Sequence, residues 1–180
     1  MPIGSCDVSA AIVGIRRVHA GLVSGLVSIP LKYAVVERER RYLVAGVPDG
    51  VVVTRDIVDR YVTGTRLRLR EVREPDGIVT RKLGQKVRLD EGPAEVACTN
   101  FYLDDAEWEV LAALPGRHLR KRRHIVERDG LRVAIDEHED GTLVAEIDDG
   151  DQPSTLVPDW LDIVQDVTDD ESWTGGSLAS

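Results

Sequence analysis

Apolar and polar residues alternate along most of the chain after residue 32, which is the pattern of β-strands that have two unlike faces. Turn sequences such as Pro48-Asp49-Gly50 separate the alternating runs and indicate hairpins. The pattern predicts eight short strands, at residues 33–44, 51–62, 66–72, 77–89, 95–103, 118–127, 131–137 and 142–148. Eight strands joined by tight turns suggest hairpins that close an antiparallel sheet or barrel.

Helical spacing of apolar residues is found in two places. Asp104 is suited to cap a helix and Glu107 to complete a capping box, and apolar residues recur behind them at Trp108, Leu111 and Leu114. A second helix is predicted near Pro158, where Trp160, Leu161 and Val164 can form an apolar stripe. We therefore predict an α+β protein, an eight-stranded antiparallel β-barrel with a few flanking helices.

The first 32 residues lack this periodicity. They are rich in Ala, Gly, Ser and Val, and we expect a poorly ordered or peripheral extension there, followed by one domain over residues 33–180. Arg16 and Arg17 end an apolar stretch far too short to span a membrane, so a cytoplasmic protein without a membrane partner is expected. Cys6 and Cys98 match neither a disulfide framework nor a metal-binding spacing.

The net charge of −9 hides a sorting of charges along the chain. Residues 60–88 contain nine basic and three acidic residues, and residues 117–132 contain seven basic and two acidic ones. Residues 133–180 contain fourteen acidic residues and no Lys or Arg. Basic segments that folding brings together can bind an anion despite the negative total.

Charged residues share one face of several predicted strands, because side chains two positions apart on a strand point the same way. The sets are Glu37, Glu39 and Arg41; Arg66, Arg68 and Arg70; Lys82, Lys86 and Arg88; Lys121 and Arg123; Glu146 and Asp148. One such strand is most simply a solvated surface. Several of them in one barrel indicate charges that face inward, where they need counter-ions.

The two kinds of charge predict two kinds of ligand. Carboxylates are the hard oxygen ligands that Mg²⁺ or Mn²⁺ prefers, and the candidates are Glu37, Glu39, Asp136, Glu146 and Asp148. Arginine and lysine match phosphate oxygens, and the candidates are Arg41, Arg66, Arg68, Lys82, Lys86, Lys121 and Arg123. A triphosphate or polyphosphate bridged by a divalent cation satisfies both sets.

Residues 37–44, ERERRYLV, resemble the first-strand signature of the CYTH superfamily, the triphosphate tunnel metalloenzymes, whose hallmark is Glu-x-Glu-x-Lys. Further motifs resemble that superfamily in the expected order, at residues 65–70, 82–86, 121–123 and 145–148. The superfamily includes class IV adenylate cyclases, thiamine triphosphatases and inorganic triphosphatases. The resemblance implies an eight-stranded tunnel with metal-binding Glu37, Glu39 and Glu146, and phosphate-binding Arg41, Arg66, Arg68, Lys82 and Arg123.

The chain departs from the superfamily's pattern in four places. Arg41 replaces the usual Lys, which keeps the charge and changes its geometry. Asp148 stands where Glu is common, and residues 136–141 lack a hydrophobic residue that commonly follows the Asp. The first 32 residues have no counterpart, since the signature strand usually opens the domain.

The expected function is metal-dependent hydrolysis of inorganic tripolyphosphate or a similar triphosphate, with Glu37, Glu39 and Arg41 as catalytic residues. One ion would hold the triphosphate, a second would orient the attacking water, and no protein nucleophile is required. The alternatives are a class IV-type adenylate cyclase and a non-catalytic polyphosphate- or nucleotide-binding module. Nucleic acid is a less favoured partner, because Leu and Val rather than aromatic residues separate the arginines. A homodimer is one open possibility.

Overall fold

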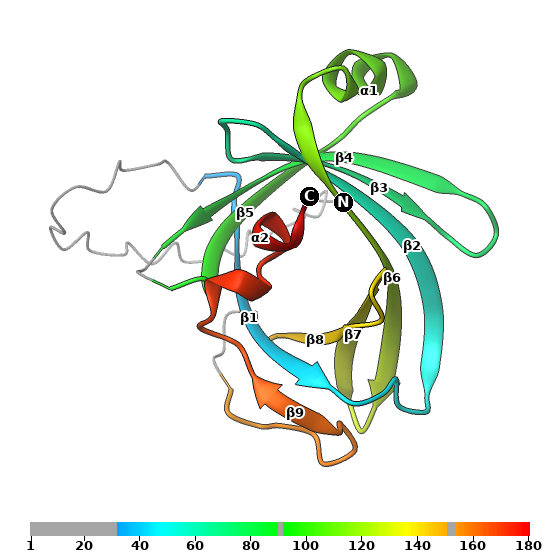
Figure 1. Ribbon diagram of the computed structural model, residues 1–180, viewed down its shortest axis with the longest axis vertical. Coiled ribbons are helices and arrows are strands. Elements are labelled where there is room, and N and C mark those ends of the chain that lie inside the picture. Colours follow the sequence, from blue (N-terminus) through cyan, green and yellow to red (C-terminus); the bar gives the residue numbers. More distant parts are fainter. Residues whose placement is uncertain (1–31, 90–91, 151–153) are drawn as a thin grey trace, which may run out of the picture. The chain divides into compact units, whose positions relative to one another are not determined.

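Eight antiparallel strands close into a barrel, which confirms the predicted fold class (Figure 1). The computed structural model describes residues 32–89, 92–150 and 154–180. The barrel strands are β1 (Val35–Val44), β2 (Val51–Val62), β3 (Leu67–Arg73), β4 (Val79–Arg88), β5 (Glu95–Tyr102), β6 (Gly116–Arg128), β7 (Leu131–His138) and β8 (Leu143–Asp148). Each corresponds to one predicted strand, because the alternation of polar and apolar residues is strong in all eight.

The barrel closes where β1 meets both ends of the sheet. Neighbouring strands follow the order β5-β4-β3-β2-β6-β7-β8-β1, and β1 returns to β5 with Val35 opposite Cys98. This second pairing covers only the first half of that edge of β1. A ninth strand, β9 (Ile163–Asp166), pairs with the second half, at Tyr42–Val44.

The predicted second helix near Pro158 is wrong. A turn follows Pro158, and the chain then extends into β9, which donates and accepts hydrogen bonds along the edge of β1 that β5 leaves uncovered. The apolar residues that suggested a helical stripe serve different contacts: Leu161 is buried in the core, while Val164 is 66% exposed. An unpaired strand edge thus decides the conformation of a segment whose own periodicity is ambiguous.

The predicted first helix is confirmed as α1 (Asp105–Ala112), which lies outside the barrel between β5 and β6 (Figure 1). The Glu107 amide donates to Asp104 Oδ1 over 2.8 Å, and the Asp104 amide donates to Glu107 Oε2 over 3.0 Å. These two bonds form the capping box that the sequence predicts. Arg81 of β4 ties the helix to the barrel wall through an ion pair with Asp105 and a contact with the Trp108 ring.

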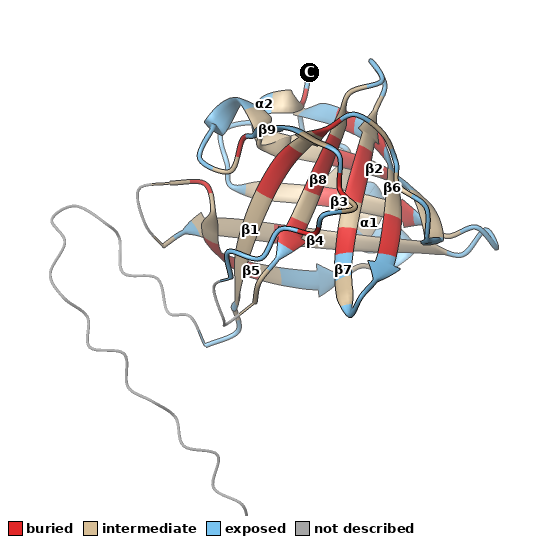
Figure 2. Ribbon diagram, turned by 90° about the horizontal axis from the view of Figure 1, so that it is seen from below, coloured by how far each residue is buried: buried red, intermediate tan, exposed pale blue. Residues whose placement is uncertain are grey.

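The main hydrophobic core lies on the outer side of the barrel wall. Tyr42, Val133, Ile135 and Ala145 are buried there against Leu161 of the segment that leads into β9. Figure 2 shows such buried residues as bands within β1 and β8. Because the apolar residues of these strands face this outer core, the alternate positions are directed into the barrel.

The C-terminal segment covers one end of the barrel. It contains a short 3-10 helix (Glu171–Trp173) and α2 (Gly175–Leu178). Ser180 and His118 exchange two backbone hydrogen bonds of 3.0 and 2.8 Å, which attach the chain end to β6. A Cβ atom on Gly175 would lie 2.2 Å from the Tyr61 hydroxyl oxygen, so a larger residue here would require Tyr61 or the segment to shift.

One predicted strand boundary differs from the structure, and one predicted domain boundary falls at the edge of the described residues. Arg66 is not part of a strand, because Thr65 forms a turn with Val62 and accepts the Leu67 amide, so that β3 begins at Leu67. The predicted extension lies almost entirely outside the described residues, and its limit at residue 32 stays a prediction. Among the helices that the structure describes, none is long and apolar enough to cross a membrane.

Candidate functional site

Charged side chains from different strands meet on the inner face of the barrel. Lys86 of β4 contacts Glu37 and Glu39 of β1, although β5 lies between the two strands. Arg123 of β6 similarly contacts Glu146 of β8 across β7. Contacts that pass over an intervening strand require side chains on one shared face, so these residues line a common interior.

Two glutamates of β1 form the first cluster. Lys86 Nζ lies 2.8 Å from Glu37 Oε2 and 2.5 Å from Glu39 Oε1, and Arg41 Nη2 lies 2.5 Å from Glu39 Oε2. Burial alone would raise the pKa of Glu39, and so would the nearby Glu146 carboxylate. The Lys86 and Arg41 cations outweigh both and hold this pKa below its ordinary value, so Glu39 is ionised near neutral pH.

Glu146 belongs to a second, more deeply buried network. Arg123 donates to Glu146 Oε2 over 2.5 Å and to both oxygens of Asp136 over 2.6 and 2.7 Å. Lys121 also donates to Asp136, which is 1% exposed. Burial would raise the pKa of Glu146, but Arg123 lowers it to about 2. Asp136 is held well below its ordinary pKa, against the effect of burial, by Arg123 and Lys121.

The third cluster is mainly cationic and contains a residue that the sequence did not single out. Asp59 of β2 is fully buried and accepts two hydrogen bonds from Arg70, of 2.6 and 2.7 Å, while Arg68 lies 3.7 Å away. Lys82 makes no ion pair with any carboxylate that the structure describes. Burial, followed by Arg70 and Arg68, lowers its pKa. A local excess of positive charge therefore remains for an anion.

Asp59 could have been found from strand parity, as Arg70 was. Asp59 lies in a predicted strand, and a lone acidic residue on the inward face of that strand needs a cation. Its register partner on β3 is Arg70, which shares a face with Arg68. The pairing of β2 with β3 is the additional information that connects the two residues.

Two predicted site residues lie apart from these clusters. Arg66 is exposed in the bend before β3. Asp148 is exposed at the end of β8, where its Oδ1 accepts the Gly150 amide over 2.9 Å and the Arg38 amide over 3.3 Å. The side chain of Asp148 therefore caps a turn in this structure, and its role as a metal ligand stays a prediction.

The carboxylates of β1 and β8 fit a divalent cation by their chemistry. Glu37 and Glu39 already hold one cation, the Lys86 ammonium, between two of their oxygens. Within the described ranges, no three acidic, His or Cys side chains converge on one point, because Glu146 is turned toward Arg123. The fit therefore rests on the type of ligand atom, since carboxylate oxygens are the hard ligands that Mg²⁺ or Mn²⁺ prefers.

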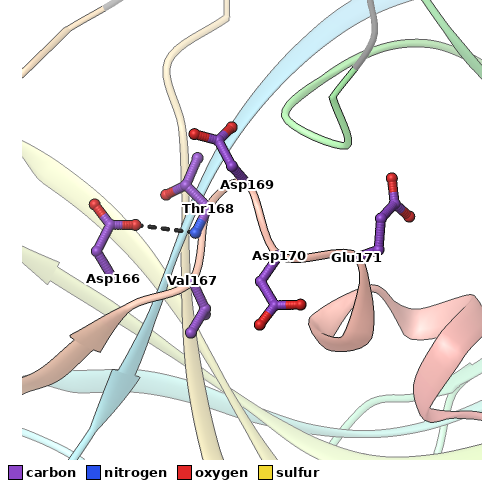
Figure 3. A pocket seen from close by; sticks show the side chains of 6 residues that line it. All are labelled: Asp166, Val167, Thr168, Asp169, Asp170 and Glu171. Carbon is purple, nitrogen blue, oxygen red and sulfur yellow. Dashed lines mark hydrogen bonds between the residues drawn. The ribbon is translucent and has the colours of Figure 1, made fainter.

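A separate pocket of about 530 Å³ lies on the C-terminal segment (Figure 3). Its six lining residues include four acidic ones, Asp166, Asp169, Asp170 and Glu171, and no Lys or Arg. The Asp166 carboxylate accepts the Thr168 amide over 2.9 Å. The negative charge of this lining disfavours phosphate, so the pocket does not compete with the barrel interior as a phosphate site.

The depressed pKa values predict acid sensitivity. Glu146 has a pKa of about 2 in the folded protein against an ordinary 4.5, and the pKa of Glu39 is lowered too. Such groups stabilise the fold fully above the unfolded-state pKa and stop doing so as pH falls through the folded-state pKa. We expect the Tm to be nearly constant from about pH 7 to 5 and to fall steeply from about pH 4.5 toward 2.

The measurement is thermal unfolding of the wild type, Glu146→Gln and Glu127→Gln across this pH range. Glu127 pairs with Arg132 on the exposed surface and provides the control. The difference in Tm between wild type and Glu146→Gln should shrink as the pH approaches 2. A difference in Tm that stays constant with pH would show that protonation of Glu146 does not cause the pH dependence of stability.

Comparison with known proteins identifies the fold. Two solved structures of the protein NE1496, described in one as an inorganic triphosphatase and in the other as a hypothetical protein, are 23% and 22% identical to this chain, each with a TM-score of 0.51. The matches cover 79% of this chain and 93% and 97% of those chains. A conserved hypothetical protein from Pyrococcus furiosus is 18% identical, with 68% and 80% of the two chains covered and a TM-score of 0.49. No family model and no curated protein matches the sequence.

The chain therefore folds as a closed eight-stranded antiparallel barrel, with charged clusters from several strands on its inner face. Among solved proteins, the inorganic triphosphatase NE1496 has a similar fold. The predicted barrel fold is confirmed, and membership of the CYTH superfamily stays a prediction.

Proposed function

We propose that this protein hydrolyses the phosphoanhydride bond of a triphosphate, inorganic tripolyphosphate or a similar organic triphosphate, with the help of Mg²⁺ or Mn²⁺. The observation that carries the proposal is the division of the barrel interior into two parts. Glu37, Glu39 and Glu146 come from β1 and β8, and the cations around Asp59 come from β3 and β4. A metal–triphosphate complex has the two matching kinds of group.

The cationic cluster is suited to orient the phosphates. Asp59 holds Arg70 in a bidentate pair, which directs a planar guanidinium into the interior, and Lys82 adds a point charge on the next strand, directly opposite Arg70 in the register. Groups fixed in this way need little rearrangement when negative charge develops on the transferred phosphoryl group. Positioning and charge neutralisation are most of what phosphoryl transfer requires.

The acidic residues would hold the metal. Glu37, Glu39 and Glu146 are the proposed ligands, and the bound ion would neutralise phosphate charge as a Lewis acid. Lys86 and Arg41 keep Glu39 ionised, and Arg123 keeps Glu146 ionised, so that these two carboxylates are available at neutral pH. The cations that contact these carboxylates can then turn to phosphate oxygens.

Water is the proposed nucleophile, because the candidate protein nucleophiles and bases are engaged elsewhere. His118 is hydrogen-bonded to Arg60, and His124 to Thr54 and Glu137. Burial raises the pKa of the Cys98 thiol and keeps it protonated. We also propose a cytoplasmic location, and the sequence leaves a homodimer open.

Phosphate release from tripolyphosphate, ATP and thiamine triphosphate tests the proposal. Metal-stripped protein should release no phosphate, and Mg²⁺ or Mn²⁺ should restore release. Lys82→Met should raise the KM for tripolyphosphate about 10-fold, because it removes a cation without a carboxylate partner in the described residues. The control is Arg122→Met, which removes an exposed cation paired with Glu137 on the outer face.

Each other outcome has a distinct meaning. Tight tripolyphosphate binding without phosphate release would replace hydrolysis by a non-catalytic binding function. Formation of cyclic AMP from ATP would indicate an adenylate cyclase. Equal effects of Lys82→Met and Arg122→Met on KM would show that the barrel interior does not bind the substrate.

A further inference from the structure

Lys86 bridges the two glutamates of β1 in the barrel interior. It contacts two of the three proposed metal ligands at once, with its Nζ atom 2.8 Å from Glu37 Oε2 and 2.5 Å from Glu39 Oε1. Arg41 contacts Glu39 and, at 3.8 Å, Glu146, whereas Arg123 contacts Glu146 and Asp136. Among the described ion pairs, Lys86 is therefore the cation that joins Glu37 to Glu39.

A divalent ion and the Lys86 ammonium cannot both lie between the same two carboxylate oxygens. Both are positive, and an ammonium 2.5 to 2.8 Å from the oxygens occupies the volume that a metal ion at about 2.1 Å would need. Metal binding at Glu37 and Glu39 thus requires Lys86 to move. A stronger contact between the Lys86 ammonium and these carboxylates therefore means a weaker affinity for the metal.

Lys86 is also the cation best able to leave. Its head group is a compact point charge on a flexible four-carbon stem, and its side chain is 33% exposed. Arg41, by contrast, is 5% exposed, and its guanidinium is within 3.5 Å of the Pro93 carbonyl as well as bonded to Glu39. Displacement of Lys86 therefore costs less rearrangement than displacement of Arg41.

We propose that Lys86 is an exchangeable internal cation that competes with the divalent metal for Glu37 and Glu39 and, once displaced, binds a phosphate oxygen of the substrate. The inference rests on the proposed function, because it concerns the same site. It adds a coupling that the function alone does not require. Metal binding frees a cation for the phosphate, and by thermodynamic reciprocity phosphate binding to that cation favours the metal.

The test is direct binding of Mn²⁺ to the full chain, measured by calorimetry without phosphate at neutral pH. Lys86→Met should bind Mn²⁺ about 10-fold more tightly than the wild type, because the competing ammonium is gone. The same variant should bind tripolyphosphate more weakly. A lysine with a merely structural role would not raise metal affinity when it is removed.

Two further variants serve as controls. Lys86→Arg keeps a positive charge and should retain the Mn²⁺ affinity of the wild type within about 3-fold. Arg88→Met removes a cation from the same face of β4, but Arg88 pairs with Glu171 of the C-terminal segment, so its loss should leave Mn²⁺ affinity unchanged. If Lys86→Met is poorly folded without metal, the rise in its Tm on addition of Mn²⁺ should exceed that of the wild type.

The outcomes separate this inference from the proposed function. Unchanged or weaker Mn²⁺ binding by Lys86→Met would overturn the competition, even if the wild type hydrolyses tripolyphosphate. Tighter Mn²⁺ binding by Lys86→Met would support the competition, even if no substrate is hydrolysed. Absence of Mn²⁺ binding in both proteins would overturn the inference, because no metal then competes for the glutamates.

Discussion

Glu39→Gln is expected to lower the kcat for tripolyphosphate by about 100-fold or more, the scale of loss when a group that stabilises transition-state charge is removed. The substitution preserves the shape of the side chain and removes one negative charge from the cluster with Lys86 and Arg41. A neutral amide is a poor ligand for Mg²⁺ compared with a carboxylate. The measurement is phosphate release at saturating metal and substrate.

In the absence of metal, the same variant should not bind tripolyphosphate more weakly. Loss of a negative charge leaves the interior more positive, so the affinity for an anion should stay equal or rise while kcat falls. The matched control is Glu95→Gln, which removes a carboxylate that pairs with Arg38 at 3.0 Å outside the site. A Glu39→Gln enzyme with more than half of the wild-type kcat would show that Glu39 is not part of the catalytic machinery.

Asp136→Asn is expected to lower the free energy of unfolding by about 3 kcal/mol or more, because removal of one partner leaves buried charges uncompensated. Asp136 is 1% exposed and is paired with Lys121 and Arg123 together. Arg123 would keep its contact with Glu146, whereas Lys121, which is 8% exposed, would lose the carboxylate that balances it. Urea unfolding, followed by circular dichroism, measures the change.

Glu137→Gln provides the control for Asp136. Glu137 is the next residue of β7 and faces the outer side, where it pairs with the exposed Arg122. Loss of such a surface pair should change the free energy of unfolding by less than about 1 kcal/mol. Similar urea midpoints for the two variants would contradict a structural role for the buried Asp136 network.

Most of the site residues that can be predicted from the sequence follow from the alternation of side chains along each strand. The alternation in residues 37–44 placed Glu37, Glu39 and Arg41 on one face, and these three side chains do lie together with Lys86 in the barrel interior. The two-residue alternation of strands, the short turns and the helix cap are local features of the sequence. Eight strands and one capped helix could therefore be predicted. The number of strands and the turns between them suggested a sheet or barrel, and the resemblance to a known superfamily implied its closure into a tunnel.

Local patterns failed where a partner strand or a turn decides the outcome. Residues 163–166 became a strand because half of one edge of β1 is left open by β5, a fact that no local periodicity contains. Arg66 lies outside β3 because Thr65 closes the turn that precedes the strand. Asp59 was missed because its cation, Arg70, lies on the neighbouring strand, and only the register brings the two together.

Residue spacing is enough to predict the eight barrel strands, the face that carries the charges and the order of the basic and acidic segments. Which charges pair depends on the closed barrel. Lys86 reaches the glutamates of β1 across β5, and Arg123 reaches Glu146 across β7. Closure of the barrel creates these contacts between residues 47 and 23 positions apart, and Coulomb interactions in a buried interior are strong enough to fix the pairs.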